Sequence, residues 1–285
     1  MPVTLSQQIQ QFYDASSGLW EKVWGEHMHH GYYGSQGQER KPRRQAQIDL
    51  IEELLRWAQV QKPQQILDVG CGIGGSSLYL AQKYTAQVTG ITLSPVQANR
   101  ATLRAQAAEL QAQTEFQVAD ALHTPFADAT FDLVWSLESG EHMPDKTQFL
   151  QECCRVLKPG GLLLVATWCH RPLPPSLRWS EQRLLQDIYR VYYLPYVISL
   201  PDYAEIAQTL PLTELQVADW SEAVAPFWQD VIASALNPQV IWGILNAGLP
   251  TLQGALALRL MSRGYRQGLI RYGVLQGIKG AKENA

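Results

Sequence analysis

A glycine-rich turn near residue 70 is the segment of this sequence best suited to bind a small molecule. Residues 66–69 (ILDV) are predicted to form a short buried strand, and residues 70–75 (GCGIGG) a tight turn that opens a helix. Glycine lets a ligand approach the backbone without a Cβ in the way, and a helix N-terminus favours a negative group. Gly70, Gly72 and Gly75 fit the dinucleotide spacing G-x-G-x-x-G, which many plain turns also match. We expect the N–H groups of this turn to be free and to point at one ligand.

Two neighbouring residues argue against a nicotinamide dinucleotide. That cofactor needs an acidic residue about 20 positions further on to bind its ribose, and Thr92 stands there. Asp68 lies inside the first strand, where a dinucleotide fold usually has an apolar residue. The pattern resembles instead the first motif of the S-adenosylmethionine (SAM) dependent methyltransferases. In that family the turn lies under the methionine part of SAM, and the acid helps to hold its amino group.

Predicted strands and helices alternate around this turn. After the first strand, further strands are expected at residues 87–93, 114–120, 131–137, 161–168, 213–220 and 268–279. Helices are expected at residues 5–16, 48–58, 145–157, 180–193 and 202–209. The alternation predicts an α/β fold with a doubly wound, mostly parallel seven-stranded sheet. Ligands bind such sheets beyond the C-terminal ends of the strands, where Thr92, Asp120 and Leu137 are expected.

The length of 285 residues suits one α/β domain with a helical insertion. We expect residues 62–170 to form the cofactor-binding core and residues 1–61 an N-terminal lid. Residues 171–267 are expected to supply helices that cover the substrate, with a strand near 213–220, and residues 268–279 the last strand.

The N-terminal segment LWEKVWGEHMHHGYYG (residues 19–34) combines aromatic rings with His27, His29 and His30. This composition suits a lid that faces a ligand, and it equally suits a surface loop whose rings cover the core. A metal site is not expected, because His27 and His29 would diverge in most backbones. No carboxylate–histidine pair at helical spacing accompanies them.

The composition excludes several classes of function. The formal net charge of −3 gives no basic surface for nucleic acid. The four cysteines form no C-x-x-C pair, which argues against structural zinc and for a reducing compartment. The N-terminus has neither a basic head nor an apolar run, so we expect no signal peptide and a cytoplasmic protein.

The C-terminal third contains a charge-free stretch from Val231 to Leu258. Asn237-Pro238 and the Gly248–Pro250 segment interrupt it, so two or three short helices are predicted rather than a membrane span. Arg259, Arg263 and Arg266 then fall on one helical face. Such a face suits peripheral contact with an anionic membrane, and it also suits a helix with a solvated basic side.

The whole chain, and not only the glycine turn, resembles the γ-tocopherol methyltransferases of cyanobacteria and plastids, within the class I SAM-dependent methyltransferases. The longest matching segments are FYDASSGLWEKVWGEHMHHGYYG, ILDVGCGIGGSSLYLA, WSLESGEHMPDK and DWSEAVAPFW. GITLSPVQA, RVLKPGG, TWCHRP and LPYVISLPDY also match. No transit peptide of the plastid kind is present, so a bacterial source is expected.

The resemblance implies a set of SAM-binding residues. Asp68, Gly70, Cys71, Gly72 and Gly74 would surround the methionine part; Thr92, Leu93 and Gln97 would border the ribose and adenine; Asp120, Ala121 and Leu137 would complete the adenine side. The acidic residue usual after the second strand is absent from this chain.

The resemblance also implies a reaction, methyl transfer from SAM to C5 of the γ-tocopherol ring, and similarly to δ-tocopherol. A ring carbon next to a phenol is a weak nucleophile until the hydroxyl gives up its proton, so a general base working near neutral pH is expected. His142 is the first candidate, oriented by Glu141, and Glu138, His30 and His29 follow. The alternative for His142 is a hydrogen bond that holds its own loop.

A prenylated acceptor needs an apolar channel or the bilayer itself for its tail. The charge-free stretch could supply that channel together with the rings of Trp228, Trp242, Tyr189, Tyr192, Tyr193 and Tyr196. Rings of this kind are also typical of an ordinary core.

Three other functions fit parts of the sequence. A related methyltransferase that acts on an indole alkaloid nitrogen would share the GEHMP segment. A nicotinamide-dependent oxidoreductase would share the glycine turn, although Thr92 argues against it. A non-catalytic SAM- or lipid-binding protein would share the fold. The oligomeric state and the preference between γ and δ forms stay open.

Overall fold

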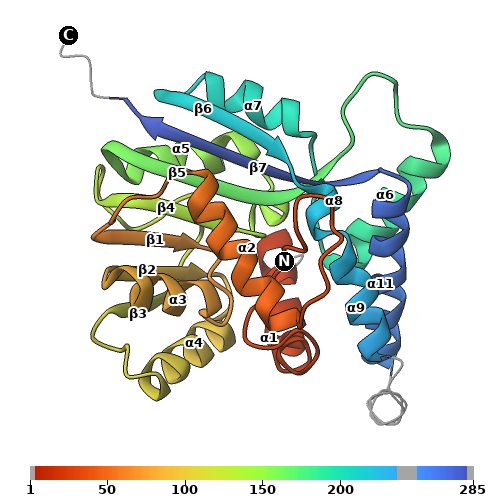
Figure 1. The fold of residues 1–285 in the computed structure, drawn as a ribbon, viewed down its shortest axis with the longest axis horizontal. Helices are drawn as coiled ribbons and strands as arrows, with labels where there is room; N and C mark the ends of the chain where they lie inside the picture. Colours follow the sequence, from red (N-terminus) through yellow and green to blue (C-terminus); the bar gives the residue numbers. More distant parts are fainter. Residues whose placement is uncertain (1–3, 236–248, 281–285) are drawn as a thin grey trace.

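Seven strands form one sheet in the computed structural model, which describes residues 4–235 and 249–280 (Figure 1). They are β1 (Gln65–Val69), β2 (Gln87–Thr92), β3 (Thr114–Val118), β4 (Phe131–Leu137), β5 (Leu157–His170), β6 (Leu212–Asp219) and β7 (Ile270–Lys279). Their order across the sheet is β3-β2-β1-β4-β5-β7-β6. β7 is antiparallel to β5 and β6, whereas the other neighbours are parallel. The predicted fold class is therefore confirmed.

Helices pack on both faces of this sheet. The described helices are α1 (Leu5–Trp24), α2 (Arg43–Trp57), α3 (Gly75–Tyr84), α4 (Pro95–Ala107), α5 (Lys146–Val156), α6 (Trp179–Tyr192), α7 (Leu200–Gln208), α8 (Ser221–Val224), α9 (Pro226–Ala235) and α11 (Leu249–Arg266), with a 3-10 turn, η1, at Gly140–His142. One hydrophobic cluster joins α2 and α3 to the sheet, and a second joins α5 and α7 to it. Trp135 of β4 belongs to the first cluster and Val134 to the second, as the alternation of a strand requires.

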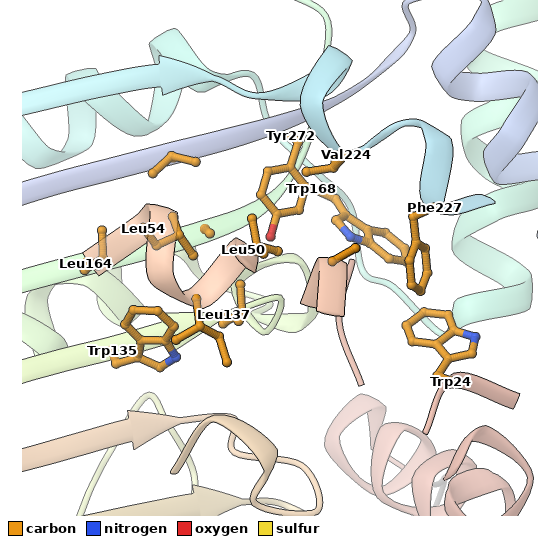
Figure 2. Packing of buried hydrophobic residues seen from close by; sticks show 14 of the residues in the cluster. Trp24, Leu50, Leu54, Trp135, Leu137, Leu164, Trp168, Val224, Phe227 and Tyr272 are labelled. Atoms are coloured by element: carbon orange, nitrogen blue, oxygen red, sulfur yellow. The ribbon is translucent and has the colours of Figure 1, made fainter. Parts of the chain in front are cut away.

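The first cluster extends past the end of the sheet toward helices α6, α9 and α11, which together with α8 are called the helical cover (Figure 2). Figure 2 shows Trp168 of β5 beside Phe227 of α9 and Tyr272 of β7, with Trp24 of α1 below them. The rings of Trp24 and Phe227 meet edge to face, with centroids 5.2 Å apart. The end of α1 is therefore part of the core and not a separate flap.

The first helix is longer than predicted. The sequence suggested an end near residue 16, because serine and glycine follow, but α1 continues to Trp24. The Ser17 hydroxyl is buried and donates to the Tyr13 carbonyl one turn earlier, so this serine is satisfied inside the helix. The helix ends at Gly25, whose φ of 89° no helical residue adopts.

The fifth strand starts earlier than predicted. Lys158–Gly161 was expected to separate helix from strand, yet β5 begins at Leu157, directly after α5. The pairing of β4 with β5 jumps from Phe131–Leu157 to Leu133–Leu162, so the intervening residues of β5 bulge out of the ladder. The bounds of α5, α6 and α7 lie within about two residues of the predicted helices.

Helices α8, α9 and α11 follow β6 in the part of the chain that the structure describes, and α11 has 18 residues, longer than the short helices predicted for residues 231–258. α8 and α9 lead up to residue 235, and α11 packs against both α9 and α6 (Figure 1). Of the predicted charge-free segment, residues 231–235 end α9 and residues 249–258 begin α11, while residues 236–248, with Trp242, lie outside the described residues. No described helix is long and apolar enough to cross a membrane. The division into lid, core and cover stays a prediction.

Candidate active site

A cavity lies where the sequence predicts it, at the C-terminal ends of β1 to β4. Every predicted cofactor residue except Gly74 lines it. The other wall is mostly apolar and aromatic, and comes from α1, the segment after α1, and the ends of β4 and β5. That wall includes Ile9, Phe12, Tyr13, Trp24, Met28, His29, Glu138, Glu141, His142, Met143, Trp168 and Tyr192.

Hydrogen bonds within the fold use three N–H groups of the glycine turn, those of Gly70, Cys71 and Gly74, which corrects the expectation that all of them are free. The N–H groups of Gly70 and Cys71 both donate to the Ile91 carbonyl of β2, each at 2.9 Å, and that of Gly74 donates to the Cys71 carbonyl. Gly70 has a φ of 82°, and a Cβ there would lie 2.2 Å from that of Ser139. The turn needs glycine at position 70 because β4 approaches it from behind.

The other glycines of the turn have different tasks. Gly74 has a φ of 83° and faces Ala101 and Phe116, so it shapes the start of α3 and does not touch the cavity. A Cβ on Gly75 would lie 2.5 Å from the Glu26 carbonyl, so this glycine admits the N-terminal segment. At Gly72 the nearest atom to an added Cβ is the Met28 sulfur at 3.9 Å, which leaves open space at the cavity.

Asp68 is the second-last residue of β1, and its carboxyl group is buried. The Ser77 hydroxyl donates to it at 2.5 Å. Burial raises the pKa of Asp68 to about 7. A cationic group placed beside this carboxyl would favour its ionised form.

The end of β2 connects the cofactor wall to α1. Thr92 donates from Oγ1 to Oε1 of Gln97 at 2.8 Å, and Ser94 caps α4 by accepting from the Gln97 N–H at 3.0 Å. The Ser94 hydroxyl in turn donates to Asp14 of α1. The first helix is therefore bonded to the strand end that borders the predicted ribose position.

Glu141 and His142 lie on η1, directly after β4, and both line the cavity. The Thr167 hydroxyl donates to Glu141 at 2.8 Å. Burial, with repulsion from Glu138, raises the pKa of Glu141 to about 8. His142 Nε2 lies 2.7 Å from the Tyr13 hydroxyl of α1, and burial lowers the pKa of His142 to about 3.

Glu138 is the best-bonded carboxylate of the cavity wall. His30 donates to it from its backbone N–H at 2.7 Å and from Nδ1 at 2.8 Å. Trp168 Nε1 and the Tyr272 hydroxyl donate at 3.2 and 3.0 Å. Although burial opposes ionisation, the contacts with His30 hold the pKa of Glu138 below its usual range. Glu138 is thus an ionised group whose oxygens are already occupied.

His30 lies behind Glu138 and does not line the cavity. Its ring is fully buried among the rings of Trp168, Phe227, Trp228, Tyr265 and Tyr272, whose centroids are 4.9 to 5.9 Å away. The segment that contains it is therefore an inner layer of the protein, and the reading as a surface loop is wrong.

The neighbouring histidines are buried too. His29 lines the cavity, and its Nδ1 lies 2.7 Å from the His30 carbonyl. The rings of His27 and His29 lie 5.3 Å apart and do not diverge as expected. Among the residues that the structure describes, no cluster of histidine, cysteine or carboxylate could hold a metal ion.

Comparisons with known proteins agree with this geometry. Residues 67–165 match the family described as methyltransferase domain. The chain is 48% identical over 279 residues to the chloroplastic tocopherol O-methyltransferase of Arabidopsis thaliana, covering 94% of this chain and 80% of that one. It is 50% identical over 283 residues to a rice protein described as a probable tocopherol O-methyltransferase, covering 96% and 78%.

The chain belongs to the tocopherol methyltransferase family of SAM-dependent enzymes. An alkaloid enzyme is also related, at lower identity. Norajmaline N-methyltransferase of Rauvolfia serpentina is 34% identical over 286 residues, covering 93% of this chain and 95% of that one. Among solved structures, the [4+2]-cyclase SpnF superposes with a TM-score of 0.81 at 27% identity, covering 99% and 98%.

SAM is the cofactor of this methyltransferase, and the cavity fits it. Asp68 lines this cavity with a buried carboxyl, which is the group that the resemblance assigns to the amino group of SAM. The free space over Gly72 admits a ligand against the backbone. Ala121 and Leu137 supply buried apolar surface to the same cavity.

The sequence alone misses the contribution of α1 to the methyltransferase site. Tyr13 and Asp14 bond to His142 and Ser94 across the cavity. Their position in the FYDASSG segment, which is part of the family resemblance, is the only signal for them in the sequence. A stripe of aromatic residues on an N-terminal helix does not by itself predict which strand ends it will meet.

Alanine at Gly70 and at Gly72 should separate folding from cofactor binding. Gly70→Ala clashes with Ser139 and should lower the melting temperature by several degrees or prevent folding. Gly72→Ala has a φ of 54°, which alanine adopts at a cost of about 1 kcal/mol, and should fold while SAM affinity falls. Thermal melting and calorimetric titration with SAM test this. Equal melting temperatures for the two variants would contradict it.

Proposed function

We propose that this methyltransferase transfers the SAM methyl group to ring carbon C5 of γ-tocopherol, and to the same position of δ-tocopherol. The observation that carries the proposal is identity of about one half with tocopherol O-methyltransferases over nearly the whole chain. The mostly apolar and aromatic wall of the cavity, which includes Phe12, Trp24 and Trp168, is called the acceptor wall from here on. Identity that extends through α1 and the helical cover includes this wall, and not only the cofactor half. That wall supports an aromatic acceptor.

The acceptor wall suits a flat, mostly apolar ring. Phe12, Trp24 and Trp168 contribute rings, and Met28 a flexible thioether that adapts to irregular ligands. Phe12 packs on Tyr193, which follows α6 and is 42% exposed, so this wall reaches close to the surface of the protein. We propose that the prenyl tail leaves the ring there, beneath the helical cover.

The chemistry requires placement and removal of a proton. When bound, SAM supplies a methyl group that is already electrophilic. The walls of the cavity align the acceptor with that methyl, and such alignment supplies several kcal/mol of the barrier. A base must take the phenol proton as the ring carbon attacks the methyl group. The hydrogen of that carbon then leaves as a proton and the phenol oxygen takes a proton back, so that one proton is released overall.

We propose Glu141 as the base that takes the phenol proton. Its pKa of about 8 is close to working pH, which is where a general base is most effective. His142, with a pKa of about 3, is a much weaker base, and its Nε2 already faces Tyr13. We assign to His142 a hydrogen bond that holds α1 over the acceptor. Glu138 and His30 support the wall behind it.

The alkaloid relative favours one rival function. Norajmaline N-methyltransferase shares a third of its residues with this chain, so a nitrogen acceptor needs the same basic plan. A second rival reaction is transfer to the phenol oxygen, which the names of the tocopherol relatives suggest. The cyclase SpnF has this fold as well, which is why the fold alone leaves the reaction open.

Incubation of the protein with SAM and γ-tocopherol in detergent should give α-tocopherol. The expected product keeps its free phenol, because the methyl is on carbon, and proton NMR of the purified product reads the lost ring hydrogen directly. An O-methyl ether of the same mass would favour the oxygen acceptor. Methylation of an indole alkaloid, with no tocopherol product, would contradict the proposal.

Glu141→Gln should lower turnover by about a hundredfold or more, because glutamine cannot accept the phenol proton. In the natural protein turnover should rise with pH as Glu141 ionises near pH 8, and the variant should lose this rise. SAM affinity should be nearly unchanged. Glu115→Gln, on the exposed side of β3, is the matched control. Near-full activity of Glu141→Gln, with a large loss in His142→Asn, would return the role to His142.

We propose further that the helical cover rests on an anionic membrane, where a prenylated acceptor would be dissolved. Arg259, Arg263 and Arg266 are all exposed on α11, which supports contact with lipid headgroups. A cytoplasmic location of the whole protein is part of the same proposal.

Replacing Arg259, Arg263 and Arg266 by glutamine should weaken binding to phosphatidylserine vesicles about 100-fold at low salt. Binding to pure phosphatidylcholine should not change. A variant that loses Arg40, Arg56 and Lys62, which are exposed elsewhere, controls for net charge. Vesicle sedimentation measures both variants, and equal losses in the two would refute a specific membrane face.

A further inference from the structure

A buried lysine holds the turn that carries Glu141. Lys146 is the first residue of α5, and only 2% of its surface is exposed. Its ammonium group donates to three carbonyl oxygens of the preceding turn, those of Gly140 at 2.9 Å, Glu141 at 3.0 Å and Met143 at 2.6 Å. A lysine ammonium has three N–H donors, so the group is fully bonded by one short segment.

The same turn is anchored from the sheet. The Tyr203 hydroxyl of α7 donates to the Gly140 carbonyl at 3.3 Å, and the Thr167 hydroxyl of β5 donates to the Glu141 carboxyl. A Cβ at Gly140 would lie 2.9 Å from the Thr167 hydroxyl, so the backbone is pressed against β5. Lysine, tyrosine and threonine therefore fix the turn from two sides.

Burying the ammonium group of Lys146 is energetically unfavourable, so its position needs an explanation. Burial lowers the pKa of Lys146 to about 8, although the nearby Glu141 opposes the change. The Tyr196 ring faces the ammonium at 4.8 Å and offsets part of that cost. A hydrophobic residue would fill the space, but would leave carbonyls that converge on one point without their donor.

We propose that Lys146 is a positioning residue, which fixes the Gly140–His142 turn and so holds the Glu141 carboxyl at the acceptor wall. The proposal rests on the function of Glu141 proposed above. It goes further, because it assigns the geometry of that carboxyl, and part of its acidity, to a residue that does not line the cavity. A nearby positive charge favours the ionised form of Glu141, and thus the base form.

Other charged and titratable groups face Glu141 as well, and they must be the same in the natural protein and in any Lys146 variant compared with it. They are Glu138 of β4, Tyr13 of α1, Cys169 of β5, Tyr203 of α7, Tyr265 of α11 and Tyr272 of β7. Among these, Glu138 is the group held ionised, and it opposes ionisation of Glu141. Lys146 is the cation that counters it.

Lys146→Met tests the proposal by its pH profile. We expect turnover to fall about tenfold at pH 7.5, and the rise of turnover with pH to shift upward by about one unit, because the cation that favours ionised Glu141 is gone. The KM for SAM should stay within about threefold, since the glycine turn is not touched. Lys83→Met is the control, since it removes a lysine of α3 that is paired with Glu52 of α2. Its turnover and pH profile should match those of the natural protein.

A second measurement does not need an acceptor. Amide hydrogen exchange at His142 and Met143 should be slow in the natural protein and faster in Lys146→Met, while Lys146→Arg should fall between them. If the natural protein fails to methylate tocopherol but shows this pattern, the proposed function is wrong and the positioning role holds. Unchanged exchange in Lys146→Met, or an unchanged pH profile in an active variant, would overturn the role. If Lys146→Met does not fold, Lys146→Arg decides by the same two readouts.

Discussion

The buried carboxylate of Glu138 is the constraint on which the rest of the site depends. A carboxylate far from water is unfavourable unless its oxygens are hydrogen-bonded. Glu138 meets this condition with donors from His30, Trp168 and Tyr272. These donors belong to three segments that are far apart in sequence. One ionised group thus links the N-terminal segment to β4, β5 and β7. The rings of Trp168, Phe227, Trp228, Tyr265 and Tyr272 pack around the His30 ring at this link.

The same carboxylate sets the chemistry of its neighbour. Glu138 stays ionised because it is fully bonded, and its charge raises the pKa of Glu141 further than burial alone would. Two carboxyls on one short segment therefore have pKa values shifted in opposite directions, and the proposed base, Glu141, is the one whose pKa is raised. Lys146 acts against this repulsion from the other side of η1. The raised pKa of Glu141 therefore comes first from burial and then from repulsion by Glu138, and Lys146 opposes both.

The sequence predicts the parts of this site that depend on local pattern. The strand ILDV, the glycine turn and the ends of the next strands follow from alternation and from glycine, and they lie where predicted. The burial of His30 could not be predicted, because it depends on Trp168 and Tyr272 meeting it from β5 and β7. The length of α1 was missed for a local reason. Ser17 bonds back to its own helix, which propensity alone does not reveal.

The expected free amides of the glycine turn show why motif and mechanism must be separated. The pattern predicts a turn, and the turn is there, but the N–H groups of Gly70 and Cys71 are used to hold it against β2. On this side the cavity also presents the Asp68 carboxyl and the open space over Gly72. Helix α1 bonds both to Ser94, beside the predicted cofactor residues, and to His142, beside the proposed base, so one helix joins the two halves of the cavity. Alignment of two ligands is most of what methyl transfer requires, and the proposed reaction would draw that alignment from this one packing arrangement.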